Sequence, residues 1–389
     1  MPEVIEWGSG GTPKATVKEY YENGDIPWLI IGDLNNGIVT KSETKITKLG
    51  LDNSSAKMIP PNTLLVAMYG SIGKLGITGI ECCTNQAIAF AKKMHGVTTK
   101  YMFYYMAMMK SKLISKGKGG TQKNISQTVL NSLDVIVPPM KEQQRIVTRI
   151  EELFSQLDSG VETLKKTKEQ LKVYRQAILS EAFPTLSKAN KKLLYEIAEI
   201  SGGITKGRKL SPNDSIELPY LRVANVQNGY LNLSQIKTIQ LKKTEREKYL
   251  LKFGDVLYTE GGDRDKLGRG TVWKDEVANC VHQNHIFKAR INNSLAIPEY
   301  IAYWSMAGTA REYFYKNGKQ TVNLASINKT VLSNLPIPIV PLELQYKTIK
   351  EIESRLSVCD SIEKTIDTAL QEAEGLRQSI LKQAFEGGV

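Results

Sequence analysis

The chain has 389 residues, 41% of them hydrophobic, so it can bury more than one core and two to three domains are expected. No run reaches the roughly eighteen apolar residues of a membrane-spanning helix, and the N-terminus lacks a basic, apolar signal. These features exclude a membrane protein and favour a soluble, unexported one in the cytoplasm.

The net charge of +12 is distributed unevenly along the chain. Residues 1–138 carry a net +5 and residues 190–340 a net +8, whereas 139–189 and 341–389 together come to −1. A basic excess on folded segments, rather than on a tail, indicates a polyanionic partner, most often nucleic acid. Ordinary solubilising lysine is the alternative explanation.

The four cysteines are Cys82, Cys83, Cys280 and Cys359. The adjacent pair suits neither a disulfide framework nor a zinc knuckle, so we expect free thiols in a reducing compartment.

Residues 1–138 predict a first lobe of short β-type runs bounded by turn residues. Its expected strands are 28–31, 63–68, 75–78, 87–90 and 133–137, with a helix over 100–115 before the last of them. The run from Gly70 to Leu75 resembles part of a phosphate-binding loop, but Met68 replaces the earlier glycine and no Ser or Thr follows Lys74. A strand-joining turn is the better interpretation, and 261–266 fails the same test.

Residues 139–183 predict one long helix that buries a narrow seam. Its apolar positions repeat by heptads, and at about 1.5 Å per residue the helix is about 65 Å long, so it needs a partner helix. The expected seam residues are Ile150, Leu153, Leu157, Leu164, Leu171, Tyr174 and Ile178.

After a linker at 184–192, residues 193–340 repeat the first lobe. The offset is 192 between Ser9-Gly10-Gly11 and Ser201-Gly202-Gly203, 197 between Cys83 and Cys280, and 202 by Thr330, so the second lobe carries loop insertions. The expected strands are 220–223, 255–259, 270–273, 285–287 and 335–340, with a helix over 298–315.

Residues 341–389 repeat the long helix at a constant offset of 202, which pairs Gln143 with Gln345 and Asp158 with Asp360. Its expected seam residues are Ile352, Leu356, Ile362, Ile366, Leu376 and Ile380. We therefore predict an α+β fold in which two pseudo-repeated mixed α/β lobes, with largely antiparallel sheets, are separated by two long helices packed as an antiparallel coiled coil. Because the repeat is nearly circular, the two termini should lie close together.

The best candidates for DNA contact are the loops at 116–124 and 316–323, which occupy equivalent places before the last strand of each lobe. Glycines let the backbone approach phosphates, lysines add charge, and Gln or Asn can bind adenine in the major groove. With secondary candidates included, the set is Lys14, Lys74, Lys116, Lys118, Gln122, Lys123, Asn124, Lys206, Arg208, Lys209, Arg264, Lys266, Arg269, Lys316, Lys319, Gln320 and Asn323.

No catalytic set is apparent in the sequence. His282 and His285 lack a second ligand pair at metal spacing, so strand-face or phosphate-contacting histidines are the preferred interpretation. The tetrapeptide and glycine motifs of amino-methyltransferases are absent. We therefore predict a DNA reader without catalytic residues, metal or cofactor of its own.

The alternation of two basic lobes with two matching helices resembles the specificity subunit of type I restriction-modification systems, the HsdS family. The resemblance is carried by the Pro-x-x-x-Gln-x-(Arg/Lys) starts of both helices, their Arg-Gln-(Ala/Ser)-Ile-Leu-x-x-Ala-Phe ends and the Ser-Gly-Gly lobe openings. The first lobe departs from the pattern, because it lacks a counterpart of residues 193–196 and its opening strand or helix should be shortened.

The resemblance implies two target-recognition domains, 1–138 and 193–340, that read the halves of a bipartite double-stranded DNA site. It implies that helices 139–183 and 341–389 set the spacing and dock two methyltransferase subunits, through which restriction subunits join. S-adenosylmethionine would bind the partner methyltransferase. A coiled-coil scaffold whose lobes bind other proteins is the alternative of a different class, and a stand-alone enzyme is a weaker one.

Overall fold

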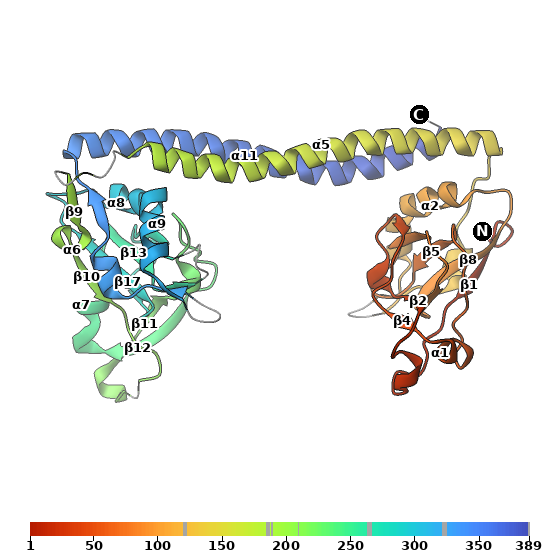
Figure 1. Ribbon diagram of the computed structural model, residues 1–389, viewed down its shortest axis with the longest axis horizontal. Helices are drawn as coiled ribbons and strands as arrows, with labels where there is room; N and C mark the ends of the chain where they lie inside the picture. The colour runs from red at the N-terminus through yellow and green to blue at the C-terminus, as the bar shows by residue number, and fades with distance from the viewer. Residues whose placement is uncertain are drawn as a thin grey trace. The chain divides into compact units, whose positions relative to one another are not determined.

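The computed structural model describes residues 1–119, 123–183, 187, 190–208, 210–262, 267–320 and 325–387. The chain divides into two compact units, one made of residues 1–164 with 368–389 and the other of residues 165–367. Each unit contains one β-rich lobe and one section of two long helices, α5 (Met140–Glu181) and α11 (Leu342–Phe385) (Figure 1). None of the described helices is long and apolar enough to cross a membrane.

The lobe of unit 1 contains a five-stranded sheet in the order β1-β8-β5-β6-β3 and a three-stranded sheet in the order β4-β2-β7. Its strands are β1 (Ile5–Ser9), β2 (Ile26–Leu29), β3 (Ile38–Val39), β4 (Lys45–Ile46), β5 (Leu64–Ala67), β6 (Leu75–Thr78), β7 (Cys83–Thr84) and β8 (Ile88–Met94). Its helices, besides two 3₁₀ turns (Lys18–Tyr20 and Ile31–Asp33), are α1 (Lys48–Asp52), α2 (Thr99–Met108), α3 (Lys110–Ser115) and α4 (Gln127–Asn131).

The lobe of unit 2 contains a four-stranded sheet in the order β10-β17-β13-β15 and smaller sheets β12-β11-β16, β14-β19-β18 and β20-β9. Its strands are β9 (Lys191–Leu193), β10 (Ala198–Gly202), β11 (Ser215–Leu221), β12 (Lys237–Lys242), β13 (Asp255–Thr259), β14 (Gly261–Gly262), β15 (Gly270–Val272), β16 (Val281–His282), β17 (Ile286–Ile291), β18 (Lys319–Gln320), β19 (Ala325–Ser326) and β20 (Pro336–Pro338). Its helices are α6 (Leu194–Ile197), α7 (Arg246–Tyr249), α8 (Pro298–Met306), α9 (Gly308–Asn317) and α10 (Lys329–Ser333), with 3₁₀ turns at Pro212–Asp214, Val223–Asn225 and Lys243–Glu245.

The α+β class and the largely antiparallel pairing are confirmed, but several expected elements differ. Each lobe also contains parallel pairing, β2–β7 and β3–β6 in unit 1 and β11–β16 in unit 2. Each single helix expected before the last strand is two helices, because α2 ends at Met108 and α8 ends at Met306. The opening strands β1 and β10, which pair with β8 and β17, were not predicted.

The strand expected at 133–137 is wrong, whereas its repeat at 335–340 contains β20. In unit 2, β20 pairs with β9, antiparallel, from Pro336 opposite Leu193 to Pro338 opposite Lys191. In unit 1 no described strand pairs with residues 133–137, and Ile136 and Val137 are 64% and 43% exposed. An isolated strand gains no ladder hydrogen bonds, so the local sequence alone does not make one.

The expected alignment of Cys83 with Cys280 is displaced by one residue. Trp28 and Leu29 pair with Cys83 and Thr84, while Tyr220 and Leu221 pair with Val281 and His282. Since Trp28 and Tyr220 are equivalent, Thr84 answers His282, and Cys82 takes the place of Cys280.

A buried glutamine fixes each long helix to its lobe in the same way. Gln143 donates to the carbonyls of Gly96 and Pro138 at 2.7 and 2.9 Å, and its Oε1 accepts from the Thr98 amide at 3.0 Å. Gln345 donates to Leu295 and Val340 and accepts from the Ile297 amide. Both glutamines are 0% exposed. The repeated Pro-x-x-x-Gln motif therefore joins helix to lobe.

Each lobe also binds the end of the helix that does not start from it. Phe385, in the last turn of α11, packs edge-on against Tyr101 and Tyr105 of α2 in unit 1. Phe183, just after α5, packs in the same way against Tyr300 and Trp304 of α8 in unit 2. Met1 and Phe385 both pack against the hydrophobic core of unit 1, so both ends of the described chain belong to this unit (Figure 1).

The two helices pack antiparallel within each unit, and three expected seam residues are wrong. Tyr174, Ile362 and Leu376 are 48%, 41% and 50% exposed, whereas Cys359 is 1% exposed. The seam of α11 follows the heptads of α5 at the constant offset, through Ile352, Cys359, Ile366, Ala373 and Ile380. Cys359 and Ala373 are small, so the prediction, which looked for large apolar residues, chose Ile362 and Leu376 instead. The other expected seam residues are buried or half-buried: Ile150, Leu153, Leu157, Leu164, Leu171, Ile178, Ile352, Leu356, Ile366 and Ile380.

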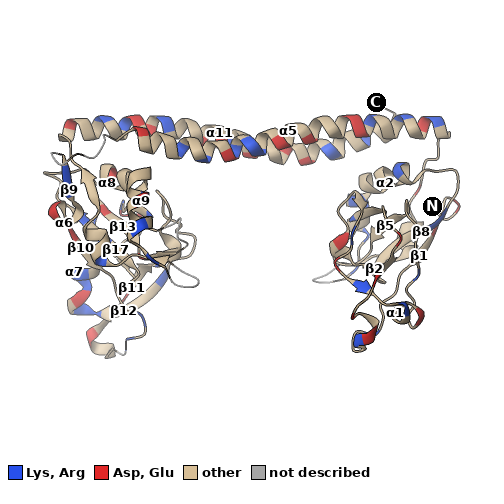
Figure 2. Ribbon diagram, viewed as in Figure 1, with Lys and Arg blue, Asp and Glu red and all other residues tan. Residues whose placement is uncertain are grey.

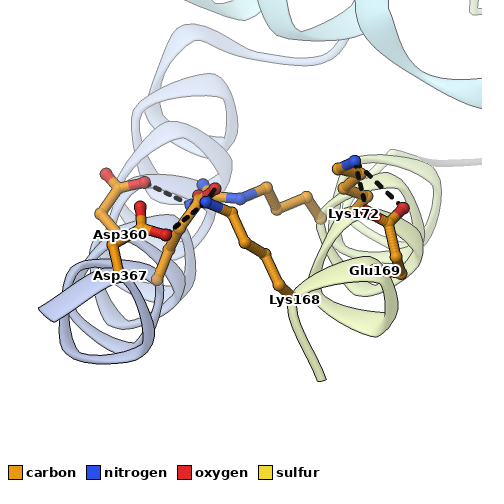
Figure 3. A network of polar contacts seen from close by, with 7 residues as sticks. Lys168, Glu169, Lys172, Asp360 and Asp367 are labelled. Atoms are coloured by element: carbon orange, nitrogen blue, oxygen red, sulfur yellow. Dashed lines mark hydrogen bonds and ion pairs between the residues drawn. The ribbon is translucent and has the colours of Figure 1, made fainter. Parts of the chain in front are cut away.

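Interhelical ion pairs flank the seam, and charges of both signs are spread along the two helices (Figure 2). In unit 2, Arg175 binds Asp360 at 2.7 Å and Glu363 at 3.0 Å, and Lys168 binds Asp367 at 2.5 Å (Figure 3). In unit 1, Arg377 pairs with Asp158, which repeats the Arg175–Asp360 pair at the offset of 202. These pairs match the antiparallel register in both units.

Candidate nucleic-acid interface

In unit 1, the first lysine loop is a hairpin that sits on the glycine turn of the same lobe. We call the described residues 116–119 and 123–124 the first hairpin. Lys118 and Asn124 exchange both backbone hydrogen bonds, at 2.8 and 3.0 Å. Asn124 also bridges to Tyr69, and its Oδ1 accepts from the Gly70 amide at 3.3 Å. The hairpin and the 70–74 turn therefore form one surface.

Unit 2 repeats this arrangement with β18 and β19, which we call the second hairpin. Lys319 and Gln320 pair with Ser326 and Ala325, and β14 adds a third strand on the other side of β19. The Ile327 amide donates to the Glu260 carbonyl, just as the Ile125 amide donates to Met68 in unit 1. The sequence predicted each loop and each turn separately, and the structure brings them together.

A glycine allows the close approach at the base of each hairpin. A Cβ at Gly117 would lie 2.8 Å from Cδ1 of Ile72, and one at Gly318 would lie 2.6 Å from Cδ1 of Leu267. Since real Cβ atoms do not approach so closely, a larger residue at either position would require the end of the Ile72 or Leu267 side chain to move.

The exposed lysines of this surface are suited to phosphate contact. Lys118 and Lys123 of the first hairpin and Lys319 of the second are exposed, as are Lys14 and Lys206 beside the lobe openings. Asn124 and Gln320 are exposed polar residues within the hairpins. The first hairpin offers Lys118, Lys123 and the Asn124 amide, and the second offers Lys319 and the Gln320 amide. Such cations and amides suit a phosphate backbone with base edges beside it.

Other candidate residues are already engaged within their own lobe. Lys74 donates to the carbonyls of Ile31 and Gly32, so it stabilises the turn. Arg208 pairs with Glu245 at 2.8 Å, and Arg269 donates to Gln227 at 3.1 Å. Lys116 donates to Ser132, and Lys316 pairs with Glu312. Gln122, Lys209, Arg264, Lys266 and Asn323 lie outside the described residues.

An acidic partner beside the second hairpin was not predicted from the sequence. Nδ1 of His285 lies 2.5 Å from Oε2 of Glu260, and the His285 side chain is 54% exposed. In unit 1 the equivalent positions hold Met68 and Ala87. The Met68 amide donates to the Ala87 carbonyl, as the Glu260 amide donates to the His285 carbonyl in unit 2. The sequence feature that could have indicated this pair is the acidic residue Glu260, directly before Gly261-Gly262. The two surfaces thus differ in charge next to equivalent hairpins.

His282 is not the exposed, phosphate-contacting histidine that the sequence allowed. It is 0% exposed, its Nδ1–H donates to the Ile286 carbonyl at 2.9 Å, and its Nε2 is buried without a partner among the described residues. Burial, followed by the positive charge of Lys288, lowers the pKa of His282 to about 3. It therefore stays neutral in the core of unit 2.

The thiols give no sign of a metal site or a reactive centre. Cys82, Cys83, Cys280 and Cys359 are free and buried, and burial raises the pKa of each of the first three to about 12. Within the described part of the chain, no group of three or more His, Cys, Asp or Glu side chains could hold a metal ion.

Comparison with protein families agrees with this geometry. A family model described as type I restriction modification DNA specificity domain matches residues 2–173 and 187–372. The chain is 23% identical to the EcoKI specificity subunit of Escherichia coli K12, over 95% of this chain and 83% of that protein. It is also 23% identical to the StySPI specificity subunit of Salmonella potsdam, over 96% of this chain and 84% of that protein.

Solved structures share the fold. One chain, from work on complex assembly and conformational transition of the type I R-M system, aligns with a TM-score of 0.71 at 17% identity, covering 100% of this chain and 99% of the other. The HsdS subunit of Thermoanaerobacter tengcongensis aligns with a TM-score of 0.55 at 16% identity, covering 100% and 98%.

Proposed function

Because this chain belongs to the family of type I restriction-modification DNA specificity subunits, we propose that it reads an asymmetric, bipartite DNA site with one lobe for each half-site. The subunit is itself non-catalytic, and catalysis belongs to partner subunits. The observation that carries the proposal is the duplicated lysine hairpin, seated on an equivalent turn in two lobes whose residues at that surface differ.

We assign residues 1–138 and 193–340 as the two target-recognition domains, 184–192 as a linker, and 139–183 and 341–389 as the spacer helices. The matched pieces of the family model, one around each lobe, support this division. Different side chains on equivalent hairpins favour two different half-site sequences, since base edges are read by specific polar contacts. The spacer role of the helix pair rests on the seam and ion pairs that join the two helices within each unit.

The partners follow from the family. Two methyltransferase subunits would dock on the helix pair, with restriction subunits joining through them, and S-adenosylmethionine would bind the methyltransferase. The buried free thiols support a reducing, cytoplasmic location.

The decisive experiment maps methylated adenines in cells that make this chain with its methyltransferase. One asymmetric bipartite motif is expected, and it should be lost when this chain is omitted. Methylation at a symmetric or continuous site, or no dependence on this chain, would contradict the proposal.

A second measurement tests the hairpins in the assembled complex. Replacing Lys118, Lys123 or Lys319 by Ala should weaken duplex binding for all sequences and reduce the slope of log K against log salt by about one for each phosphate that is no longer neutralised. Lys48, exposed on α1 and paired with Asp52, is the matched control and should leave the slope unchanged.

A further inference from the structure

The helix pair in unit 1 has an open groove on the side that does not contact the lobe. Its apolar floor consists of Leu153, Leu157, Leu376 and Ile380, and it encloses about 610 Å³. Leu376 is 50% exposed. Arg149 and Gln383 stand on its rim.

The neighbouring helix positions mark the side of the helix pair that contacts the lobe. Phe154 packs on Tyr104 of α2 with ring centroids 5.9 Å apart, and Arg377 lies over the Phe154 ring at 4.8 Å. These residues directly follow Leu153 and Leu376 in sequence, so a turn of about 100° separates the lobe side from the groove.

In unit 2 the same groove is filled by the protein itself. At the offset of 202, the residue equivalent to Leu153 is Arg355, the one equivalent to Leu376 is Tyr174, and the one equivalent to Gln383 is Glu181. The Arg355 guanidinium lies 5.7 Å from the centre of the Tyr174 ring and pairs with Glu181 at 3.1 Å. One rim position also changes sign, because Glu351 stands where unit 1 has Arg149, which pairs with Glu152 at 3.3 Å.

We propose that the two methyltransferase docking positions are unequal, and that the open groove of unit 1 binds its methyltransferase subunit first and more tightly. This inference rests on the proposed function for the identity of the partner. The groove takes an amphipathic helix that inserts an apolar side chain over Leu376 and places a carboxylate beside Arg149.

The physical reason is the difference between an open and an occupied surface. A helix that docks in unit 1 covers apolar floor that is already exposed, which is favourable in proportion to the area covered. A helix that docks in unit 2 meets Arg355 held by Glu181 and Tyr174, and it must either displace this arrangement or leave the groove unused. The partner copies are identical, so the difference in affinity comes from this chain.

The test titrates the purified full chain with its methyltransferase subunit and follows the species with one and two methyltransferases by native mass spectrometry and calorimetry. The wild type should show two binding steps whose Kd values differ by about tenfold or more. Leu376→Glu should remove the tight step and keep the weak one. Its matched control, Tyr174→Glu at the equivalent position of unit 2, should leave the tight step unchanged.

Two further variants guard against misfolding as the explanation. Arg149→Glu, on the exposed rim, should weaken the tight step by about three- to tenfold while the helix content and melting temperature remain those of the wild type. Arg355→Leu should open the second groove and bring the two steps closer together.

Two equal steps in the wild type, or equal effects of Leu376→Glu and Tyr174→Glu on the same step, would overturn this inference and leave the proposed function intact. A complete lack of methyltransferase binding would overturn both.

Discussion

At the residue scale, the two buried glutamines show how a weak motif can carry a precise structural role. A glutamine four residues after a proline is common in sequences, but Gln143 and Gln345 each satisfy two carbonyls and one amide at a helix start. A buried polar group without such partners costs free energy, so the side chain is specified by its surroundings.

Replacing Gln143 by Ala should therefore lower the free energy of unfolding of unit 1 by about 2–4 kcal/mol, because it leaves buried backbone groups unpaired. Urea unfolding followed by circular dichroism measures the loss. The exposed neighbour Gln144, changed to Ala, is the control and should cost less than about 0.5 kcal/mol. A similar loss for both variants would refute the anchoring role.

His282 predicts a pH dependence of unit 2. Its folded pKa is about 3 and its ordinary value is 6.5, so the unfolded state binds the proton more readily. The stability is complete above pH 6.5 and is lost as the pH falls towards 3, by up to about 1.4 kcal/mol per pH unit.

The equivalent position of unit 1 holds Thr84, so His282→Thr is the natural test. The variant should flatten the loss of stability between pH 6.5 and 4 in thermal unfolding of the full chain. His285→Thr, at an exposed histidine, should leave the loss in place. An unchanged pH profile in His282→Thr would show that other groups cause it.

At the scale of elements, the helix pair shows that the repeat is a better guide to the seam than apolarity is. The Leu157 position of α5 is answered by Cys359 in α11, and the larger Ile362 faces outward. A seam needs the correct position on the helix face more than it needs a large side chain.

Ile366 and Ile362 give a matched pair that tests this assignment. Ile366 is 4% exposed and Ile362 is 41% exposed. Ile366→Ala should lower the free energy of unfolding by about 2–4 kcal/mol through the cavity it leaves, whereas Ile362→Ala should cost about 1 kcal/mol or less. Equal losses in denaturant unfolding would place both residues in the seam and contradict the structure.

At the scale of the whole molecule, we expect the length of the two long helices to set the number of base pairs between the two half-sites. Removing residues 165–171 and 364–370 deletes one heptad from each helix and takes out both Lys168 and Asp367, so no partner of that ion pair is left alone. The deletion shortens the pair by about 10 Å, equivalent to at most about three base pairs.

Methylation mapping of this deletion should show a shorter tolerated spacer and unchanged half-site sequences, because the lobes are untouched. Changed half-site bases with an unchanged spacer would contradict the spacing role of the helices. The control is a variant that keeps both helices at full length and carries substitutions at the surface positions within 165–171 and 364–370.

The sequence by itself determined the order of lobes and helices, the length of the helices, their heptads and the near-circular repeat. These features are recorded along the chain, as spacing between residues and as a constant offset of 202, so they need no knowledge of what touches what. The tertiary structure decided which residues of α11 fill the seam, how Thr84 and His282 correspond, and why residues 133–137 are not a strand. It also joined each hairpin to its glycine turn and left one groove open while Arg355 fills the other. Each of these depends on a partner that is distant in sequence, and burial or pairing with a distant partner has no local signature.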